Sequence, residues 1–534
     1  MCGIVGYRGF RQATEVLLEG LRNLEYRGYD SAGISVFEDG VIRTVKSQGR
    51  IQKLEEKLAF SPLTGTCGIA HTRWATHGVP SDINAHPHRS DHVSLLHNGI
   101  IENYLELKEE LIAKGYHFVS QTDTEVAAHL ISSLYEGDPL QAISKALARI
   151  EGSYAFAILF DDHPDLVYGA LKDSPLIAAV GQGENFILSD ISATLKYTKD
   201  YYVLEDGDIV EISPEAIHIY DSSLSPVSRE LSHAHWNVEQ AQKGGFDHFM
   251  LKEIYEQPEA FSKTVVPHVK DGLPNFERDE ITEDFFENRR HIQIVACGTA
   301  MYAGTVGKNL IERFARIPVS VDVASEYRYN NPIVGPGDLV IVISQSGETA
   351  DTLAALRLAK QKGADTLGVI NVIGSSIARE ADHVIYTHAG PEIAVASTKA
   401  FTVQMAVMFL LALQPEVCRS LTDQLLDCRN SMEQALELTK TVPSIVEKAI
   451  DCPSLFYIGR GLDHALALEG SLKLKELSYL HSEAYAAGEL KHGPISLITD
   501  GMPVIALATQ QAVLPKTVSN MKEVKARGAK TLLI

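Results

Sequence analysis

Residues 338–352, DLVIVISQSGETADT, decide the fold of the second half of this 534-residue chain. After its first residue the run 338–343 is wholly apolar, as in a strand buried on both faces, and apolar residues at helical spacing follow over 351–362. Another strand of the buried type, 292–296, comes before it. Because strands that alternate with helices form βαβ units, the sequence predicts a parallel sheet from residue 291 onward.

This α/β pattern occurs twice. The segments 294–299 and 456–461 each read as a strand that ends in a small-residue turn at the start of a helix. We therefore expect two copies of one α/β unit, at 289–435 and 436–534. Residues 530–534 read as part of a strand, so we expect the second copy to be truncated at its C-terminus.

The first half has the pattern of an antiparallel sheet with helices. Two alternating strands within 34–45 flank the turn Asp39-Gly40, a strong hairpin indicator, and a second Asp-Gly turn lies at 206–207. The apolar run 153–160 adds a strand. Apolar residues recur at helical spacing over 12–24, 102–114, 122–136 and 138–150. An α+β layered domain is the expected result.

Length requires several domains, because single hydrophobic cores stop growing near roughly 250 to 300 residues. We place the layered domain at 1–240. The segment 241–288 is rich in charges and carries Gly and Pro without a long periodic pattern, which indicates a linker with short helices.

Charge and cysteine content exclude several classes of protein. The chain has 48 Lys and Arg against 69 Asp and Glu, a net charge of −21, with no basic block, which disfavours nucleic acid and anionic membrane as partners. No apolar run is long enough to span a bilayer and no secretory signal begins the chain, so we expect a soluble, cytoplasmic protein. The six cysteines form no C-x-x-C pair and read as reduced thiols.

One of these cysteines suggests nucleophilic chemistry. Removal of Met1 would leave Cys2 with a thiol and a free α-amine, a nucleophile with its own base. Farther on, the Asn98 side chain and the Gly99 N–H form a candidate oxyanion hole. The alternative for Cys2 is an ordinary cysteine in the second position.

Two charged residues are candidates for binding the two ends of an amino acid. Arg73 can hold a carboxylate with two hydrogen bonds, and Asp123 can hold an ammonium group. Each has a simpler interpretation: Arg73 as a surface ion pair, and Asp123 as the cap of a helix that begins at 124.

Several motifs of the first half resemble the N-terminal-nucleophile glutamine amidotransferase domain: CGIVG at 2–6, EYRGYDSAG at 25–33, HTRWATHG at 71–78, HNG at 97–99 and TDTE at 122–125. The resemblance implies an αββα sandwich, with Cys2 as nucleophile, its amine as base, and Asn98 and Gly99 as oxyanion hole. It also implies the glutamine contacts Arg73, Thr76, His77 and Asp123, with Trp74 helping to close the site and shield ammonia from water.

A second constellation fits a phosphate. The turn at 344–352 offers hydroxyls, a glycine and the start of a helix, which together bind phosphate without net positive charge. Small or hydroxyl-bearing turns at Gly298-Thr299 and at 397–399 would line the same crevice, at the carboxyl ends of the strands. Simple helix capping by Ser or Thr is the alternative.

A third group combines acid, base and cation. Glu469, Lys473 and Glu476 fall on one face of a helix, and His492 lies in a Gly/Pro turn where it suits ring opening. The alternative is a solvated ion-pair surface.

The second half resembles duplicated sugar isomerase (SIS) domains, which are α/β folds with parallel sheets, and the order of the two halves resembles the glutamine–fructose-6-phosphate aminotransferase family. The resemblance implies that glutamine and fructose 6-phosphate give glutamate and glucosamine 6-phosphate, through channelled ammonia and ketose–aldose isomerisation, with no metal or organic cofactor. It implies Glu476 as the group that moves a proton between C1 and C2, with help from Lys473, and His492 as the ring opener, supplied by a neighbouring subunit of a homodimer. The residues that it implies at the sugar phosphate are Ser344, Gln345, Ser346, Thr349, Val395 and Ser397, with Thr299 in the adjoining turn.

Two departures from that family leave alternatives open. Ala300 stands where the family usually has Ser, and the family's C-terminal tail, with its imine-forming lysine, lies beyond Ile534. A fragment able to hydrolyse glutamine but impaired in synthesis is one alternative. An amidotransferase with another acceptor, or a non-catalytic sugar-phosphate sensor, are the others. Histidine pairs such as His86 and His88 match no closed metal site and read as loop histidines.

Overall fold

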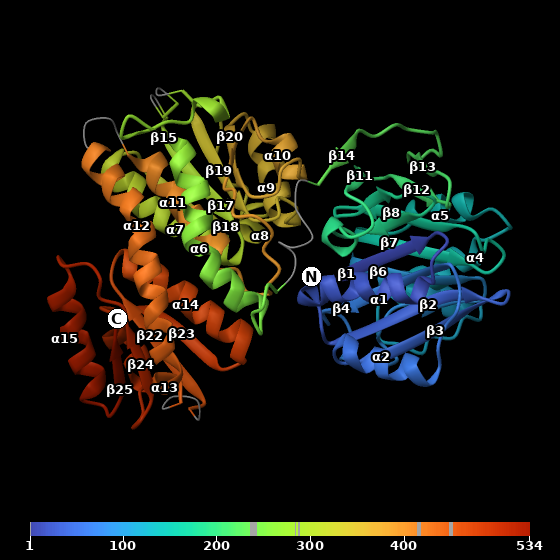
Figure 1. The fold of residues 1–534 in the computed structure, drawn as a ribbon, viewed down its shortest axis with the longest axis horizontal. Coiled ribbons are helices and arrows are strands. Elements are labelled where there is room, and N and C mark those ends of the chain that lie inside the picture. Colours follow the sequence, from blue (N-terminus) through green and yellow to red (C-terminus); the bar gives the residue numbers. More distant parts are fainter. Residues whose placement is uncertain (1, 235–242, 283–284, 287–288, 414–417, 448–451) are drawn as a thin grey trace. The chain divides into compact units, whose positions relative to one another are not determined.

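The computed structural model describes residues 2–234, 243–282, 285–286, 289–413, 418–447 and 452–534. They form two compact units that divide after Gln242, drawn in Figure 1 with blue to green for the first and green to red for the second. The domain boundary expected at 240 lies outside the described residues. Among the helices of the described ranges, none combines the length and the apolar character needed to cross a membrane.

The first unit contains an eight-stranded and a six-stranded antiparallel sheet. The order of the eight-stranded sheet is β14-β11-β9-β10-β1-β4-β2-β3, formed by β1 (Gly3–Arg8), β2 (Ser31–Glu38), β3 (Val41–Gln48), β4 (Cys67–Arg73), β9 (Ile177–Val180), β10 (Asn185–Leu188), β11 (Asp200–Val203) and β14 (Leu231–His233). The order of the six-stranded sheet is β13-β12-β8-β7-β6-β5, formed by β5 (His88–Arg89), β6 (Val93–Ile101), β7 (Gly152–Phe160), β8 (Val167–Lys172), β12 (Ile209–Ile212) and β13 (Ile217–Tyr220).

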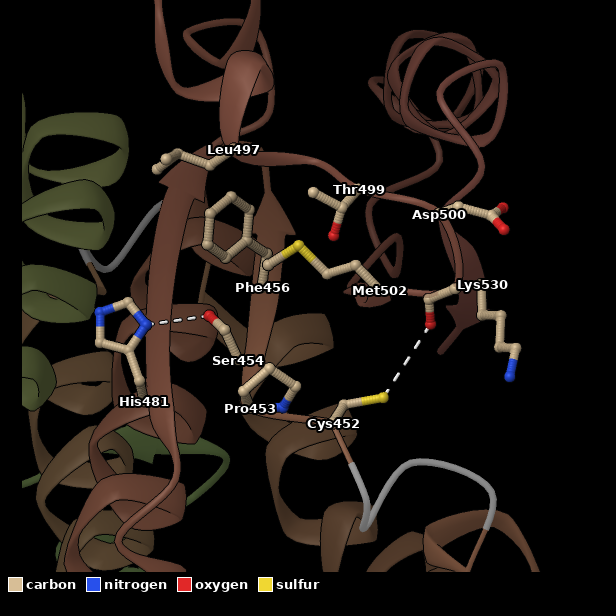
Figure 2. A pocket seen from close by; sticks show the side chains of 11 residues that line it. Cys452, Pro453, Ser454, Phe456, His481, Leu497, Thr499, Asp500, Met502 and Lys530 are labelled. Atoms are coloured by element: carbon tan, nitrogen blue, oxygen red, sulfur yellow. Dashed lines mark hydrogen bonds between the residues drawn. The ribbon is translucent and has the colours of Figure 1, made fainter.

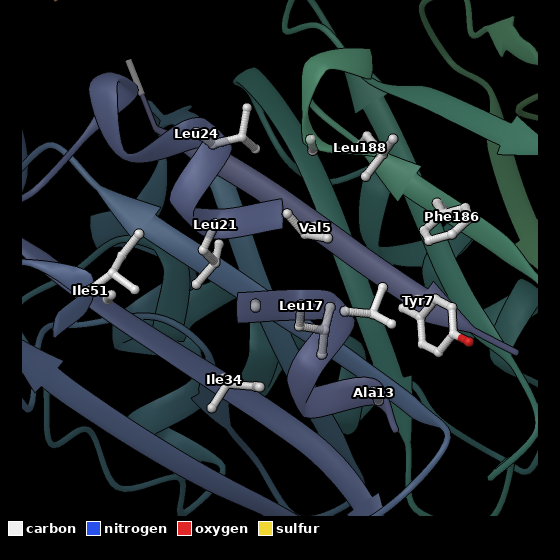
Figure 3. Close-up of a cluster of buried hydrophobic side chains, with 14 of the residues drawn as sticks. Val5, Tyr7, Ala13, Leu17, Leu21, Leu24, Ile34, Ile51, Phe186 and Leu188 are labelled. Carbon is white, nitrogen blue, oxygen red and sulfur yellow. The ribbon is translucent and has the colours of Figure 1, made fainter. Parts of the chain in front are cut away.

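Side-chain alternation along the strands explains why these sheets stack in four layers. Val5 and Tyr7 of β1 point into the apolar cluster beneath α1 (Ala13–Leu24) and α2 (Ile51–Phe60), as Figure 3 shows, whereas Ile4 packs between the two sheets. Beyond the six-stranded sheet, a third cluster lies under α3 (Tyr104–Ala113), α4 (Thr124–Ser133) and α5 (Pro139–Leu147). The predicted αββα sandwich is confirmed.

The two Asp-Gly turns behave differently. Asp39-Gly40 joins the paired strands β2 and β3, with Glu38 opposite Val41, as predicted. The strands beside Asp206-Gly207 are β11 and β12, which belong to different sheets. That turn therefore carries the chain from one layer to the other and closes no hairpin.

The second unit contains two parallel sheets. The five-stranded sheet has the order β18-β17-β19-β20-β21, formed by β17 (His291–Ala296), β18 (Val319–Val323), β19 (Asp338–Ser344), β20 (Asp365–Ile370) and β21 (His383–Tyr386). The four-stranded sheet has the order β23-β22-β24-β25, formed by β22 (Ser454–Gly459), β23 (His481–Ala486), β24 (Pro503–Ala506) and β25 (Lys530–Leu533). A two-stranded ribbon joins β15 (Val269–Lys270) and β16 (Leu273–Pro274). The described helices of the second unit are α6 (Phe249–Val265), α7 (Gly298–Phe314), α8 (Ala324–Tyr327), α9 (Ala350–Gln361), α10 (Ser376–Glu380), α11 (Lys399–Ala412), α12 (Cys418–Leu438), α13 (Val442–Val446), α14 (Leu462–Ser478) and α15 (Leu514–Lys525).

The predicted duplication is visible in the strand order. In each sheet, the strand that comes first in the sequence has the second strand on one side and the third on the other. The fourth strand lies beyond the third, and all four are parallel. Gly298 and Gly461 open the helices α7 and α14 at φ +54° and +57°, a backbone region that favours glycine. The expected boundary after 435 falls within α12 and stays a prediction.

The expectation of only short helices in the linker is wrong. α6 is 17 residues long and packs its Phe261 and Val265 with Ala406 and Leu410 of α11, inside the core of the second unit. Its buried face also holds Lys252, Glu253 and Thr264. Polar residues occupy core positions of this helix, and Pro258 lies inside it although proline usually ends a helix, so the sequence pattern did not indicate a long helix here.

Candidate active sites

The Cys2 thiol lies at the start of the central strand of the first unit. β1 begins at the next residue and pairs with β4, so that Cys2 comes beside the loop that follows Arg73. The Trp74 N–H donates to Cys2 Sγ at 3.3 Å, and the thiol faces the Trp74 carbonyl oxygen at 3.6 Å. Burial raises the pKa of the Cys2 thiol, so a base is needed to make the thiolate nucleophile.

Asn98 of β6 approaches Cys2 from the other sheet. Its Nδ2 donates to the Cys2 carbonyl oxygen at 3.0 Å, and its Oδ1 accepts from His71 Nε2 at 2.9 Å. At the next residue, a Cβ added to Gly99 would lie 2.1 Å from the Ser153 carbonyl oxygen, at φ +134°. The close approach of β6 to β7 therefore admits only glycine there.

The sequence motifs assign no role to His71, which contacts Asn98 in the structure. Burial lowers its pKa to about 3, so the ring is neutral at pH 7. Because Asn98 Oδ1 can only accept, the proton of the neutral ring lies on Nε2. The orientation of the Asn98 amide, with Nδ2 toward Cys2, is thus set by His71.

A His71→Ala variant is expected to lower kcat for glutamate release roughly tenfold or more, because an oxyanion donor is worth roughly a hundredfold or more and would lose its orientation. KM for glutamine should change little. His71→Gln keeps an N–H donor and should recover part of the rate. His218→Ala, at an exposed site, is the matched control. An equal loss of kcat in the Ala and Gln variants would contradict this role, provided that thermal melting shows both variants to be folded.

Arg73 ends β4 as a buried cation. The residue is 3 % exposed, and its guanidinium donates to the carbonyl oxygens of His77 and Gly78. Its Nη1 is buried without a hydrogen bond to any described residue. Burial lowers the pKa of this guanidinium. An unsatisfied buried N–H is costly, so the site suits an incoming carboxylate better than the surface ion pair considered above.

Asp123 does not cap a helix with its side chain. It stands at the N-cap position of α4, yet its Oδ2 accepts from the Ile101 N–H at 2.9 Å, at the end of β6. The residue is 4 % exposed. His77 Nδ1 donates to the Gln121 carbonyl oxygen at 3.1 Å, and Thr76 is exposed. The bond to Ile101 thus holds Asp123 beside the end of β6, the strand that carries Asn98 and Gly99.

In the second unit, the turn after β19 is lined with hydroxyls. Ser344 Oγ and Thr349 Oγ1 share a hydrogen bond at 3.1 Å, and Ser344 Oγ accepts from the Gly347 N–H at 3.0 Å. Ser346 Oγ accepts from the Glu348 N–H at 3.1 Å. Thr349 stands at the N-cap of α9 without a capping side-chain bond. The turn and the helix start together form an anion-binding geometry.

A charged cluster joins the two copies of the α/β unit. Lys473 Nζ of α14 lies 2.6 Å from Glu476 Oε2 and 3.4 Å from Glu469 Oε1. It also donates to Thr299 Oγ1 of α7 at 2.9 Å, and that hydroxyl donates to Glu469 at 3.1 Å. Burial raises the pKa of Glu469 against the effect of Lys473. An acid, a base and a cation thus meet beside a turn of the first copy.

Comparison with known proteins agrees with this geometry. Family models match residues 71–195 as a glutamine amidotransferase domain and residues 285–414 and 448–534 as a SIS domain. The glutamine–fructose-6-phosphate aminotransferase (isomerizing) of Clostridium tetani is 53 % identical over 544 residues, which is 100 % of this chain and 90 % of that protein. The chain belongs to the glutamine–fructose-6-phosphate aminotransferase family. A member from Thermus thermophilus is 49 % identical over 545 residues, with 100 % and 90 % covered.

A solved structure supports the SIS fold of this family member. The C-terminal domain of glucosamine-fructose-6-phosphate aminotransferase from Francisella tularensis is 43 % identical, with a TM-score of 0.53. The match covers 55 % of this chain and 84 % of the Francisella chain.

Three residues that the family resemblance places at the sugar are spread over two segments. Ser397 Oγ donates to Glu392 Oε2 at 2.7 Å, and Val395 is 39 % exposed in the same loop. His492 is exposed in the short turn Leu490–His492, and within the described chain its side chain makes no hydrogen bond or ion pair with Glu476 or Lys473. Within one chain, the described side-chain hydrogen bonds and ion pairs therefore do not link His492 to the charged cluster.

A cavity of about 470 Å³ lies at the opposite end of the second copy. Figure 2 shows it beside Ser454 and His481, the first residues of β22 and β23, with Lys530 at the start of β25. Ligands of open α/β sheets bind at the carboxyl ends of the strands. This cavity is at the amino ends, so it is not the sugar site of the family.

Proposed function

We propose that this chain makes glutamate and glucosamine 6-phosphate from glutamine and fructose 6-phosphate. The observation that carries the proposal is a half-buried Cys2, whose thiol lies within 3.6 Å of the Trp74 carbonyl and whose backbone carbonyl accepts from Asn98, in a chain about half identical to such enzymes along its whole length. The hydroxyl-lined turn after β19 and the Lys473 cluster of the second unit support the acceptor half.

In the glutamine half, the α-amine of Cys2, free once Met1 is removed, takes the thiol proton, and Sγ attacks the side-chain amide carbon. Asn98 Nδ2 and the Gly99 N–H stabilise the oxyanion. The C–N bond breaks, ammonia leaves, and water hydrolyses the thioester to release glutamate. The substrate is held by Arg73 at its carboxylate and Asp123 at its ammonium, with further contacts from Trp74, Thr76 and His77.

In the sugar half, hydroxyls and N–H groups of the β19 turn hold the phosphate, with Thr299, Val395 and Ser397 along the sugar. His492 opens the ring. Ammonia condenses with the C2 ketone and water leaves; Glu476 then carries a proton from C1 to C2, with Lys473 2.6 Å away to offset its charge. The residues proposed for the phosphate are Ser344, Gln345, Ser346 and Thr349. Ala300 packs against the apolar cluster of the first SIS copy and cannot supply the hydroxyl contact of the serine that the family usually has there.

A paired assay tests this function. Glutamate release and amino-sugar phosphate formation are measured on one sample, each with and without fructose 6-phosphate. We expect both products. Glutamate alone would indicate a chain active only as a glutaminase, and neither product from a folded sample would favour a sugar-phosphate sensor.

We infer further that the active form is a homodimer in which His492 acts in the partner's sugar site, as its exposure and lack of a side-chain partner within the described chain support. His492→Ala and Glu476→Gln chains should each be inactive in synthesis. Mixed dimers of the two should regain one intact site, because native Glu476 and native His492 then meet across the interface. Mixtures that exchange subunits without regaining activity would contradict the shared site.

A further inference from the structure

Two carboxylates outside the proposed chemistry, the buried Glu253 and the half-buried Glu392, hold the loop that carries Val395 and Ser397. Glu253 of α6 is 2 % exposed, and its Oε1 accepts from the Ile393 N–H at 2.5 Å and the Ala394 N–H at 3.0 Å. A carboxyl oxygen can accept two such bonds whether the group is ionised or protonated. The backbone immediately before Val395 is therefore anchored to α6.

The second carboxylate, Glu392, anchors the other side of the loop. Its Oε1 accepts from the N–H groups of Thr398 and Ala400, at 2.8 and 3.1 Å, while Oε2 accepts from Ser397 Oγ. Val395 thus lies between two anchored segments. The position of the loop is therefore fixed in part by Glu253 of α6, which lies 140 residues before Ile393 in the sequence.

We propose that Glu253 is a positioning residue of the sugar site: its carboxyl group fixes the Ile393–Ala394 backbone and so places Val395 and Ser397 against the sugar. The inference rests on the proposed function. Glu253 touches no reacting atom, and it acts through the loop. It differs from the residues above in coming from the segment that joins the two units in sequence.

The charges around Glu253 make this anchor sensitive to pH. Burial and the neighbouring Glu392 raise the pKa of Glu253 to about 7, while the two backbone N–H bonds and Lys399 of α11 act in the opposite direction. Lys399 is itself paired with Glu256 of α6 at 2.7 Å. On α6 itself, Lys252 lies 3.4 Å from Glu256, and from the packed helix α12 Arg429 lies 3.4 Å from Ser262.

The direction follows from linkage. A carboxyl group freed into water by opening of the loop would titrate near its ordinary value of 4.5. Its pKa is higher in the closed loop, so closing is favoured while Glu253 is protonated and loses that advantage as the pH rises through about 7. Glutamine at this position keeps the accepting oxygen but cannot titrate.

The test compares Glu253→Ala and Glu253→Gln, with Glu259→Gln on the exposed side of α6 as matched control. We expect Glu253→Ala to raise Kd and KM for fructose 6-phosphate roughly tenfold or more, because two buried N–H groups lose their acceptor. Glutamate release should stay at the native rate. Glu253→Gln should restore most of the affinity, and hydrogen exchange over 389–398 should accelerate only in the alanine variant.

The pH profile separates positioning from a merely structural role. The ratio of native to Glu253→Gln Kd for fructose 6-phosphate should rise between about pH 4.5 and 7 and level off above, with titration of the substrate phosphate cancelling in the ratio. A flat ratio, or an unchanged Kd in Glu253→Ala, would overturn the inference while native synthesis persists. Absence of fructose 6-phosphate binding by the native chain would instead overturn the proposed function.

Discussion

A Cys2→Ala variant is expected to release glutamate from glutamine at least about ten-thousandfold more slowly than the native chain, since loss of a covalent nucleophile removes the whole acyl-transfer route. The neighbouring donors, Asn98 and the Trp74 N–H, remain but have no thiolate to serve. Glutamine binding should persist, because Arg73 and Asp123 are unchanged. The measurements are glutamate release and glutamine affinity by calorimetry.

The matched control is Cys67→Ala in β4 of the same sheet. Burial raises the pKa of the Cys67 thiol to about 12, so it has no thiolate to offer, and this variant should keep the native rate. An electrophilic glutamine analogue should label the native chain and Cys67→Ala once each, and leave Cys2→Ala unlabelled. With added ammonium salt, Cys2→Ala should still form amino-sugar phosphate. Glutamate release that survives in Cys2→Ala would rule out the thioester route.

A Glu476→Gln variant is expected to lose amino-sugar phosphate formation by roughly a thousandfold or more while it releases glutamate at the native rate. The amide has nearly the shape of the carboxylate but cannot accept a proton, and general base catalysis contributes roughly a hundred- to ten-thousandfold. Lys473, 2.6 Å from the native carboxylate, would lose its ion pair with Glu476 but keep that with Glu469 and the contact with Thr299.

Two measurements make that prediction specific to proton transfer. Exchange of the C1 hydrogen of the sugar with deuterated water should stop in Glu476→Gln, whereas fructose 6-phosphate affinity should fall only slightly. Glu523→Gln on α15, away from the cluster, should behave as the native chain. Continued C1 exchange in Glu476→Gln would assign the proton to another base, with Glu469 next in line at 3.4 Å from Lys473.

Most elements could be predicted because their periodicity is local. The β2–β3 hairpin, the strands β17 and β19, and α9 all lie where the apolar spacing indicated. α6 could not be found that way, because its buried face includes Lys252, which pairs with Glu256 of the same helix, and Glu253, which accepts from the distant Ile393 N–H. Asp206-Gly207 was recognised as a turn, but only the sheet pairing shows that it joins two layers.

The candidate sites divide in the same way. The residues around Cys2 stand in short motifs, so the amino-acid sequence was sufficient to select Asn98, Gly99, Arg73 and Asp123. His71 stands inside one of those motifs, yet its bond to Asn98 depends on how β4 of one sheet faces β6 of the other. No spacing along the chain encodes that distance.

The sequence by itself determined which chemical groups are present and which local elements carry them: a second-position thiol, a hydroxyl-lined turn after a buried strand, and a Glu–Lys–Glu face on one helix. The tertiary structure alone decided how those groups are tuned. Burial lowers the pKa of His71 and raises those of Cys2, Glu253 and Glu469. The physical reason is that desolvation and Coulomb interactions depend on atoms brought close from distant parts of the chain, such as Glu253 and Ile393.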